Sequence, residues 1–376
     1  VSAEKPRKIR IDLRKNRAPT ARQNDLTRAV DGDDPQLDSL AAGERYSGKG
    51  SRSRRRTVIG EVDAEGRVVR DVNLSTCRPG RVIRAVGATQ CFVLDETTHQ
   101  TVECTVRRML RTMSSDERTV VVTGDRVLFE PADETHGVIE RVEPRQGVLT
   151  RGHQYREHVI VANVSLVAIV VSVAEPHLKP ALIDRFLISA AKGGVNAVIC
   201  LNKCDLVDLV ELQPVIGLYS RLGYPTIPLS TRTGFGMARL RQHLRNQQTV
   251  FTGQSGVGKS SLLNALNPEW KLRTGEVSGW TRKGKHTTRY AQLLELSAGS
   301  WVVDTPGIRQ LDLWGVSKGE IEAYFREFRP FVPGCKYPNC LHLEEQSGCA
   351  VRQAVQAGLI TRLRYESYTR LVIGDE

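Results

Sequence analysis

Gly253-Gln254-Ser255-Gly256-Val257-Gly258-Lys259-Ser260 is the stretch that decides the central fold of this chain, since it matches the pattern G-x-x-x-x-G-K-[ST]. The apolar run Thr249 to Phe251 predicts a strand before it, and Ser260 to Leu266 predicts a helix after it. Glycines at these positions allow backbone N–H groups to surround phosphate oxygens, and the helix N-terminus adds positive potential. The stretch therefore predicts a phosphate-binding loop, or P-loop, in an α/β domain.

Further side chains are expected to act on the phosphates and on a magnesium ion. Lys259 should reach the β- and γ-phosphates, and Ser260 should ligate Mg²⁺. Asp304-Thr305-Pro306-Gly307 follows a second apolar run downstream. After a P-loop, this pattern predicts that Asp304 holds Mg²⁺ and that Gly307 offers its backbone N–H to the γ-phosphate.

The base is read by a segment that lies before the P-loop. Asn202-Lys203-Cys204-Asp205 follows the predicted strand Asn196 to Leu201. A carboxylate at Asp205 can accept hydrogen bonds from N1–H and the N2 amino group of guanine, whereas adenine offers neither donor and leaves it unpaired. Asn202 and Lys203 are expected to brace the P-loop side and cover the base plane, with Ser230 and Thr231 in a supporting contact. The ligands predicted are GTP and GDP.

The order of these motifs indicates a rearranged fold. An ordinary GTPase begins with its P-loop and reads the base last, but here the base-reading segments come first. This order predicts a circular permutation, in which the usual chain ends are joined and new ends open between the phosphate switch and the base-reading strand. The segment after Gly307 is therefore connected directly to the γ-phosphate sensor.

A second switch is expected in Lys283-Gly284-Lys285-His286-Thr287-Thr288. A switch threonine must coordinate Mg²⁺ and sense the γ-phosphate, and Thr287 and Thr288 are both able to do so. His286 is a candidate catalytic residue beside Lys259 and Thr287; an RNA or phosphate contact, or a merely exposed imidazole, is the alternative. Ile308 stands where Ras-like enzymes use a glutamine to orient water, so slow intrinsic hydrolysis and a stimulating partner are expected.

Four residues near the C-terminus predict a metal site. Cys335, Cys340, His342 and Cys349 supply three thiolates and one imidazole, a closed ligand set suited to structural Zn²⁺. Their spacing matches no common zinc finger. The other cysteines are scattered, so a disulfide scaffold is not predicted.

Composition points to a polyanionic partner. The 376-residue chain has a formal net charge of +12, which favours nucleic acid over a membrane. No apolar run approaches the roughly 20 residues needed to span a bilayer, and the longest, Leu166 to Val173, has the length of a buried strand. With no apolar secretory segment near the N-terminus, a cytoplasmic location and no membrane partner are expected.

Four regions follow from these patterns. Residues 1–56 predict a basic, disordered tail, serving either solubility or RNA contact. Residues 57–150 contain short β-rich runs that favour an OB-fold RNA-binding barrel, with an SH3-like or other small barrel as the alternative. Residues 151–328 alternate strands and helices and predict the permuted P-loop GTPase domain. Residues 329–376 predict a small helical zinc-binding domain.

From about Thr57 to Leu371 the chain resembles the ribosome small subunit-dependent GTPase A family (RsgA, also called YjeQ). The resemblance rests on the permuted order and on five matching segments: Gly124-Asp125-Arg126-Val127, Gly253 to Ser261 with Leu262-Leu263-Asn264, Gly284 to Thr288, Asp304 to Ile308, and Cys335 through Val351. It implies an OB domain, a permuted GTPase domain, a zinc domain, and GTP hydrolysis stimulated by the small ribosomal subunit. It also implies a role in late maturation of that subunit, and His286 matches the family position proposed to assist hydrolysis.

The chain departs from the family pattern at three places. His342 to Cys349 spans one residue more than is usual, which implies a loop insertion beside the metal site. Arg289 stands where the family often has a third threonine. The basic tail before Thr57 is longer than usual.

The function expected is a monomeric GTPase that docks on 16S rRNA of the 30S subunit through its barrel and zinc domain. GTP would order the switches and reposition the zinc domain, and hydrolysis on the ribosome would release the protein. One alternative is a nonhydrolysing RNA-binding protein with a structural nucleotide. Another is a P-loop enzyme that uses GTP for metal delivery or RNA modification, for which the sequence offers neither a second open metal site nor a modification pocket.

Overall fold

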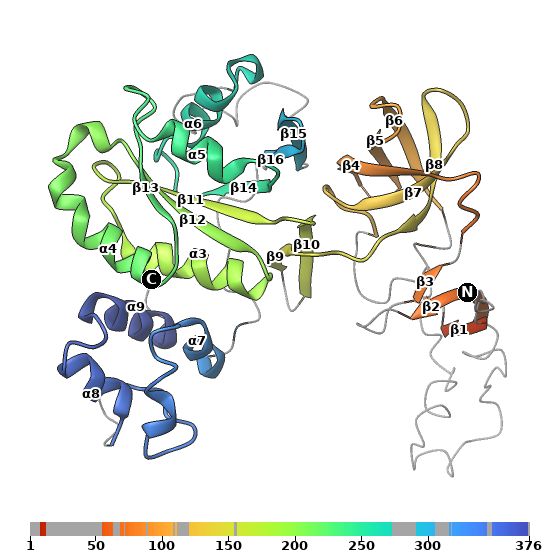
Figure 1. The fold of residues 1–376 in the computed structure, drawn as a ribbon. Helices are drawn as coiled ribbons and strands as arrows, with labels where there is room; N and C mark the ends of the chain where they lie inside the picture. Colours follow the sequence, from red (N-terminus) through yellow and green to blue (C-terminus); the bar gives the residue numbers. More distant parts are fainter. Residues whose placement is uncertain are drawn as a thin grey trace, which may run out of the picture.

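The computed structural model describes residues 8–12, 55–62, 68–70, 72–87, 89–107, 110, 120–153, 156–272, 291–304, 316, 318–343 and 348–374. Figure 1 shows a β-barrel, a central sheet flanked by helices, and a helical C-terminal region beneath the central sheet. No helix in these ranges combines the length and the apolar character needed to cross a membrane.

The central sheet is mainly parallel. Its strand order is β13-β12-β11-β14-β16-β15, and only β15 runs antiparallel to its neighbour β16. The strands are β11 (Leu166–Ser172), β12 (Asn196–Asn202), β13 (Thr226–Pro228), β14 (Gln248–Thr252), β15 (Gln292–Ser297) and β16 (Ser300–Asp304). Every residue of β11 is buried, which explains its unbroken Val/Ile/Leu sequence, since helices cover both faces of the sheet.

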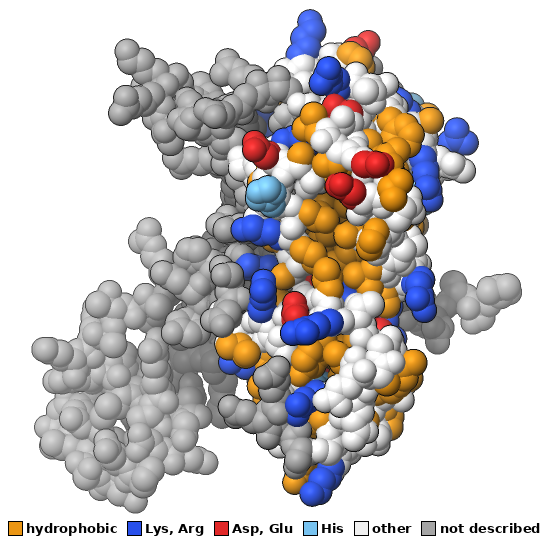
Figure 2. Space-filling view, turned by 90° about the vertical axis from the view of Figure 1, so that its left-hand side faces the viewer, with side chains coloured by type: hydrophobic (Ala, Val, Ile, Leu, Met, Phe, Trp, Pro, Cys, Tyr) orange, Lys and Arg blue, Asp and Glu red, His pale blue; other side chains and the backbone are white. Residues whose placement is uncertain are grey.

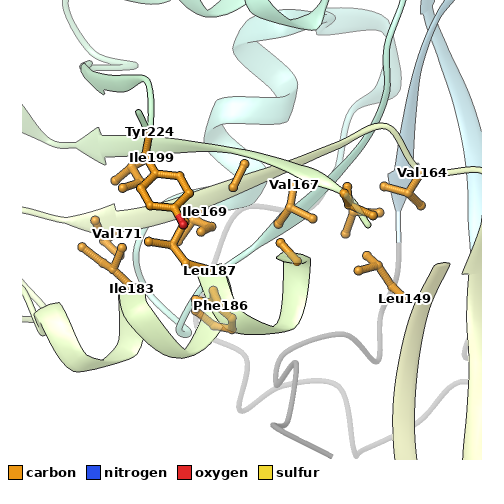
Figure 3. Packing of buried hydrophobic residues seen from close by; sticks show 14 of the residues in the cluster. Leu149, Val164, Val167, Ile169, Val171, Ile183, Phe186, Leu187, Ile199 and Tyr224 are labelled. Atoms are coloured by element: carbon orange, nitrogen blue, oxygen red, sulfur yellow. The ribbon is translucent and has the colours of Figure 1, made fainter. Parts of the chain in front are cut away.

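Successive residues of β11 pack on opposite faces of the sheet. Ile169 and Val171 pack in one cluster with Ile183 and Phe186 of α3 (Figure 3). On the other face, β11 packs against α5 and α6 through Leu166, Ala168 and Val170. The helices around the sheet are α3 (Pro180–Lys192), α4 (Gln213–Arg221), α5 (Met237–Leu244) and α6 (Lys259–Leu266). The sequence favours both ends of α3, which begins at Pro180 and ends before Gly193, because proline is tolerated in the first helical turn and glycine is enriched just after the last one.

The barrel consists of five strands in the order β4-β5-β6-β8-β7, closed by pairing of β4 with β7. They are β4 (Arg78–Val86), β5 (Gln90–Asp95), β6 (Thr101–Val106), β7 (Arg126–Pro131) and β8 (His136–Val142). The sequence shows six β-rich runs in this region, and five of them, at residues 80–84, 89–94, 101–106, 126–129 and 138–142, correspond to these strands. The sixth, Thr119 to Val122, is not a strand over its described residues 120–122.

The barrel and the central sheet are joined by hydrogen bonds. β4 pairs with β15 at Arg84 and Gln292, and the Thr123 hydroxyl donates to the carbonyl of Ala291 at 2.9 Å. The Arg81 guanidinium lies 5.5 Å from the ring centroid of Trp301 on β16. A hairpin of β9 (Val148–His153) and β10 (Arg156–Ala162) lies between the two bodies in Figure 1.

The N-terminal region holds a strand that the sequence did not predict. β1 (Lys8–Asp12) pairs antiparallel with β2 (Arg55–Val62), which also pairs with β3 (Val68–Arg70). A disordered tail over residues 1–56 therefore does not describe residues 8–12 or the start of β2. The other tail residues lie outside the described ranges.

The C-terminal region packs on an aromatic core. Phe325, Phe328 and Tyr368 have ring centroids about 5 Å apart and are fully buried. The stretch from Val351 to Leu371, for which the sequence favours helix, is divided into two helices, because Gly358 adopts a φ of 73° between them. The helices are α7 (Lys318–Tyr324), α8 (Ala350–Gln356) and α9 (Arg362–Ile373), and short 3₁₀ helices lie at Cys204–Leu206, Leu209–Leu212, Pro268–Trp270 and Val332–Gly334.

Candidate nucleotide site and metal centre

The P-loop joins β14 to α6 at the carboxyl edge of the sheet, and its glycines are required by backbone geometry. At Gly253, φ is 144°, and a Cβ there would lie 2.0 Å from the carbonyl oxygen of Val170. At Gly258, φ is 92°, and a Cβ would lie 2.5 Å from Asn202 Nδ2. Gly256 has a φ of 81° and is exposed. Only glycine adopts this run of positive φ without strain, and such a loop turns N–H groups inward as an anion cradle.

The predicted phosphate-contacting side chains lie around this cradle. Lys259 Nζ donates to the backbone carbonyls of Gly253 at 2.6 Å and Gln254 at 2.5 Å, so its ammonium group lies against the loop. Ser255 is exposed and Val257 is buried. Ser260 and Ser261 follow in the first turn of α6, both half-buried. The residues fit a bound phosphate, because cationic and N–H donors converge on one accessible loop.

The base-reading segment is hydrogen-bonded directly to the P-loop. Asn202, at the end of β12, is 1% exposed and donates through Nδ2 to the carbonyl of Val257 at 2.8 Å. Lys203 adopts a left-handed conformation with φ 64°, and its ammonium group donates to the carbonyl of Glu175. The structure therefore brings the two predicted motifs together, although 47 residues of chain lie between Asp205 and Gly253.

Asp205 lies in the turn that follows. A hydrogen bond from the Ser230 side chain lowers the pKa of Asp205 below its ordinary value, with a smaller contribution from Arg232 at 3.9 Å. The backbone N–H of Cys204 donates to the carbonyl of Leu229 at 3.2 Å, and this bond joins the two base-reading segments. Thr231 is half-buried in the same turn as Ser230. The lowered pKa favours the ionised carboxylate, which is able to accept hydrogen bonds.

Most of the predicted switch residues lie outside the described ranges. These are His286, Thr287, Thr288 and Gly307. Asp304 is the last residue of β16, which runs parallel to and beside β14, the strand that leads into the P-loop. The backbone of Asp304 therefore leaves the sheet next to the P-loop, as a magnesium-binding residue requires.

A turn that the sequence analysis missed also lies at this edge. Ser172, the last residue of β11, is 1% exposed, and its hydroxyl donates to the carbonyl of Glu175 at 2.8 Å. This is the same carbonyl that accepts from Lys203. No short motif marks the turn; its only signal is a polar residue ending a fully apolar strand.

The four predicted metal ligands converge. The ligand atoms of Cys335, Cys340, His342 and Cys349 all lie within 4.8 Å of one another. His342 Nδ1 is 3.6 Å from the Cys335 sulfur and 3.3 Å from the Cys349 sulfur. The longer His342–Cys349 spacing therefore does not keep the ligands apart.

Two groups outside the ligand set position His342, and sequence reasoning missed both. Glu322 of α7 lies 2.6 Å from His342 Nε2, leaving Nδ1 directed at the sulfurs, and the Tyr365 hydroxyl donates to the His342 carbonyl at 2.6 Å. Burial raises the pKa of the Cys349 thiol to about 12. A cation would offset this cost of ionising buried thiols, and a carboxylate behind a ligating histidine is typical of metal centres. The residues thus fit a structural metal such as Zn²⁺.

Comparison with known proteins decides the family. A family model described as RsgA GTPase matches residues 142–314. A protein of Alkaliphilus metalliredigens named small ribosomal subunit biogenesis GTPase RsgA is 37% identical over 295 residues, 78% of this chain and 96% of the relative. The chain belongs to the RsgA family. A Moorella thermoacetica protein of the same name is 44% identical over 252 residues, 67% of this chain and 84% of the relative.

Solved structures agree with this membership. YjeQ from Thermotoga maritima superposes with a TM-score of 0.65 at 34% identity, covering 79% of this chain and 98% of that one. YloQ, described as a circularly permuted GTPase, gives a TM-score of 0.63 at 27% identity, covering 81% and 97%. The predicted family, the permuted order and the enzyme class, GTP hydrolase, are thereby confirmed.

Proposed function

We propose that this chain is a GTPase of small ribosomal subunit biogenesis that binds the 30S subunit through 16S rRNA and assists its late maturation. The observation that carries the proposal is the joined nucleotide site of an RsgA-family protein, in which Asn202 of the base-reading segment bonds the P-loop at Val257. The relatives from Alkaliphilus and Moorella are named small ribosomal subunit biogenesis GTPases, the function predicted from the sequence.

The nucleotide roles assigned from the sequence are part of the proposal. The P-loop from Gly253 to Ser261 binds the phosphates, with Lys259 on the β- and γ-phosphates. Asn202, Lys203 and Asp205 read guanine, supported by Ser230 and Thr231. Ser260 and Asp304 hold Mg²⁺, and Gly307 contacts the γ-phosphate.

Hydrolysis is assigned to the switch region. His286 and Thr287 act on the attacking water and the γ-phosphate, with Thr288 as the second candidate ligand of Mg²⁺. Because Ile308 replaces a water-orienting glutamine, hydrolysis depends on docking to the subunit, and the loss of the γ-phosphate releases the protein.

We assign RNA binding to the barrel, residues 57–150, as an OB-fold. The closed order β4-β5-β6-β8-β7, with β6 and β8 parallel, is compatible with that fold. Arg78 and Arg107 on the barrel are half exposed, and the chain carries a net charge of +12. Figure 2 views the opposite side of the molecule, the side that carries α4 and α8 in Figure 1, and there Lys and Arg side chains are spread among apolar ones.

The C-terminal region is assigned as a zinc domain that responds to the nucleotide. Its support is the convergent Cys335, Cys340, His342 and Cys349 set and the packing of α9 on α3 of the GTPase domain 151–328. We expect one Zn²⁺ per chain, a monomer in solution and a cytoplasmic location.

The test is the GTP hydrolysis rate of the purified protein, titrated with 30S particles at about 50 and 200 mM salt. The rate should rise with 30S, and the half-saturating concentration should increase steeply at the higher salt, because RNA docking releases counterions. Lys259→Ala should abolish stimulation, while Lys192→Ala, at the end of α3, should leave it intact. No turnover either with or without 30S would instead favour an RNA-binding protein with a structural nucleotide.

A further inference from the structure

Ser172 occupies a special position in the central sheet. The chain passes from β13 back across β12 and β11 to form β14, so the strand order reverses between β11 and β14. In open α/β sheets, ligands bind outside the carboxyl ends of the strands at such a reversal. Ser172 is the carboxyl-terminal residue of β11 and therefore lies at this point. It is also directly paired in register with Asn202.

The Ser172 side chain folds a tight turn beyond the strand. Its hydroxyl donates to the Glu175 carbonyl at 2.8 Å and accepts from the Ala174 N–H at 3.3 Å. The backbone N–H of Val173 donates to the Asn202 carbonyl at 3.1 Å, which holds the start of the turn on β12. Since Ser172 is 1% exposed, water cannot readily replace its hydroxyl in these bonds.

This turn contacts both parts of the nucleotide site. The Glu175 carbonyl has two lone pairs; one accepts from Ser172 and the other from the Lys203 ammonium group. On the other side, Pro176 Cδ lies 3.8 Å from the position of a Cβ built on Gly256 of the P-loop. The turn thus lies between the lysine expected to cover the base and the loop expected to hold the phosphates.

We propose that Ser172 is a positioning residue of the guanine-nucleotide site, which acts by fixing the Glu175 carbonyl that anchors Lys203. Anchoring the ammonium group restricts a long and otherwise mobile side chain to the geometry in which its methylene stem lies over the base. Without the Ser172 hydroxyl, the Glu175 carbonyl loses its fixed direction, and the Lys203 side chain is no longer held in place before the nucleotide binds. Restricting that side chain on binding then lowers the nucleotide affinity. The inference rests on the proposed role of Lys203 and not on the ribosomal partner.

The test is a double-mutant cycle on the free protein, with the Kd of a fluorescent GDP analogue as the readout. Ser172→Ala should raise the Kd about fivefold, the effect of one net hydrogen bond. Lys203→Ala should raise it at least as much. In the Lys203→Ala background, Ser172→Ala should have no further effect, because coupled residues are not additive. A purely structural role of Ser172 would weaken binding equally in both backgrounds and would overturn the proposal.

Two comparisons control for the effect on folding. Ser172→Thr and Ser172→Val have nearly the same shape, so the threonine should keep the Kd near that of the wild type and the valine should raise it. Ser165→Ala removes a serine just before β11 at the opposite edge of the sheet, where it also bonds the neighbouring strand, and should leave the Kd unchanged. Equal Kd values for the Thr and Val variants would refute the inference.

Different results would reject the base-site assignment and the role of Ser172. If Lys203→Ala leaves GDP affinity unchanged, the base-site assignment itself is wrong and the inference fails with it. If Lys203→Ala weakens GDP binding but Ser172→Ala does not, the base-site assignment stands and the role of Ser172 is rejected.

Discussion

Replacement of Arg364 by methionine should detach the C-terminal region from the GTPase domain. Arg364 of α9 is 3% exposed and pairs with Asp184 of α3, which is fully buried. Its Nε lies 2.5 Å from Glu327, and the Tyr219 hydroxyl donates to Asp184 at 2.8 Å. Arg364 therefore supplies the positive charge of a buried network that joins two parts of the fold.

The magnitude follows from the charge left behind. Burial already raises the pKa of Asp184, and Arg364 opposes that rise. Removing one partner of a buried ion pair costs about 3–5 kcal/mol, because the other charge remains without compensation. In a domain of this size, such a loss should lower the melting temperature by about 10 °C. Arg362→Met is the matched control: its side chain is 87% exposed and pairs with Glu366 within α9, so about 0.5 kcal/mol is at stake.

The assay is thermal unfolding followed by circular dichroism at pH 5 and pH 8. The pKa of Asp184 in the folded Arg364→Met variant should lie above its value in the unfolded chain, so protonation of Asp184 stabilises the fold. The loss of melting temperature relative to the wild type should therefore grow as the pH rises from the unfolded pKa through the folded pKa. Asp184→Asn combined with Arg364→Met should recover much of the loss, since no isolated charge then remains at Asp184. Equal melting temperatures for Arg364→Met and Arg362→Met would refute this reasoning.

Three other outcomes are expected. Gly253→Ala should weaken GDP binding at least tenfold in a titration, because its Cβ would collide with the Val170 carbonyl; unchanged affinity would contradict the loop geometry. The ratio of GDP to inosine diphosphate affinity should stay constant from pH 7.5 to pH 5, since the lowered pKa of Asp205 keeps its carboxylate ionised, and a falling ratio would argue against that role. The protein should hold one zinc by elemental analysis and lose it in Cys340→Ala but not in Cys77→Ala; equal zinc in both would exclude the cluster.

The sequence predicted those parts of the site whose chemistry is carried by contiguous residues. The P-loop is one unbroken stretch, and its glycines follow from local backbone geometry. The apolar run of β11 and the proline that begins α3 are local signals too. The Cys and His residues of the metal centre were found because thiolate and imidazole together have few other uses.

The contacts that the sequence did not predict join residues far apart in the chain. Glu322 reaches His342 from another helix, and Arg364 reaches Asp184 from another region of the fold. Ser172 belongs to no motif, so its importance emerges only when Lys203 is seen to share its acceptor. Likewise β1 pairs with β2, which begins more than 40 residues later, and no local sequence pattern predicts such a pairing.

Because the barrel and the central sheet are paired through their strands, the GTPase domain should not behave well when it is separated from the barrel. β4 covers part of the outer edge of β15, and Arg81 shields Trp301 beside it. A shortened chain that starts after the barrel would leave β15 with unpaired backbone groups next to an uncovered indole, the kind of edge through which sheets of different molecules join. Such a fragment should self-associate when expressed alone, so the barrel also acts as a built-in protector of the enzyme's solubility.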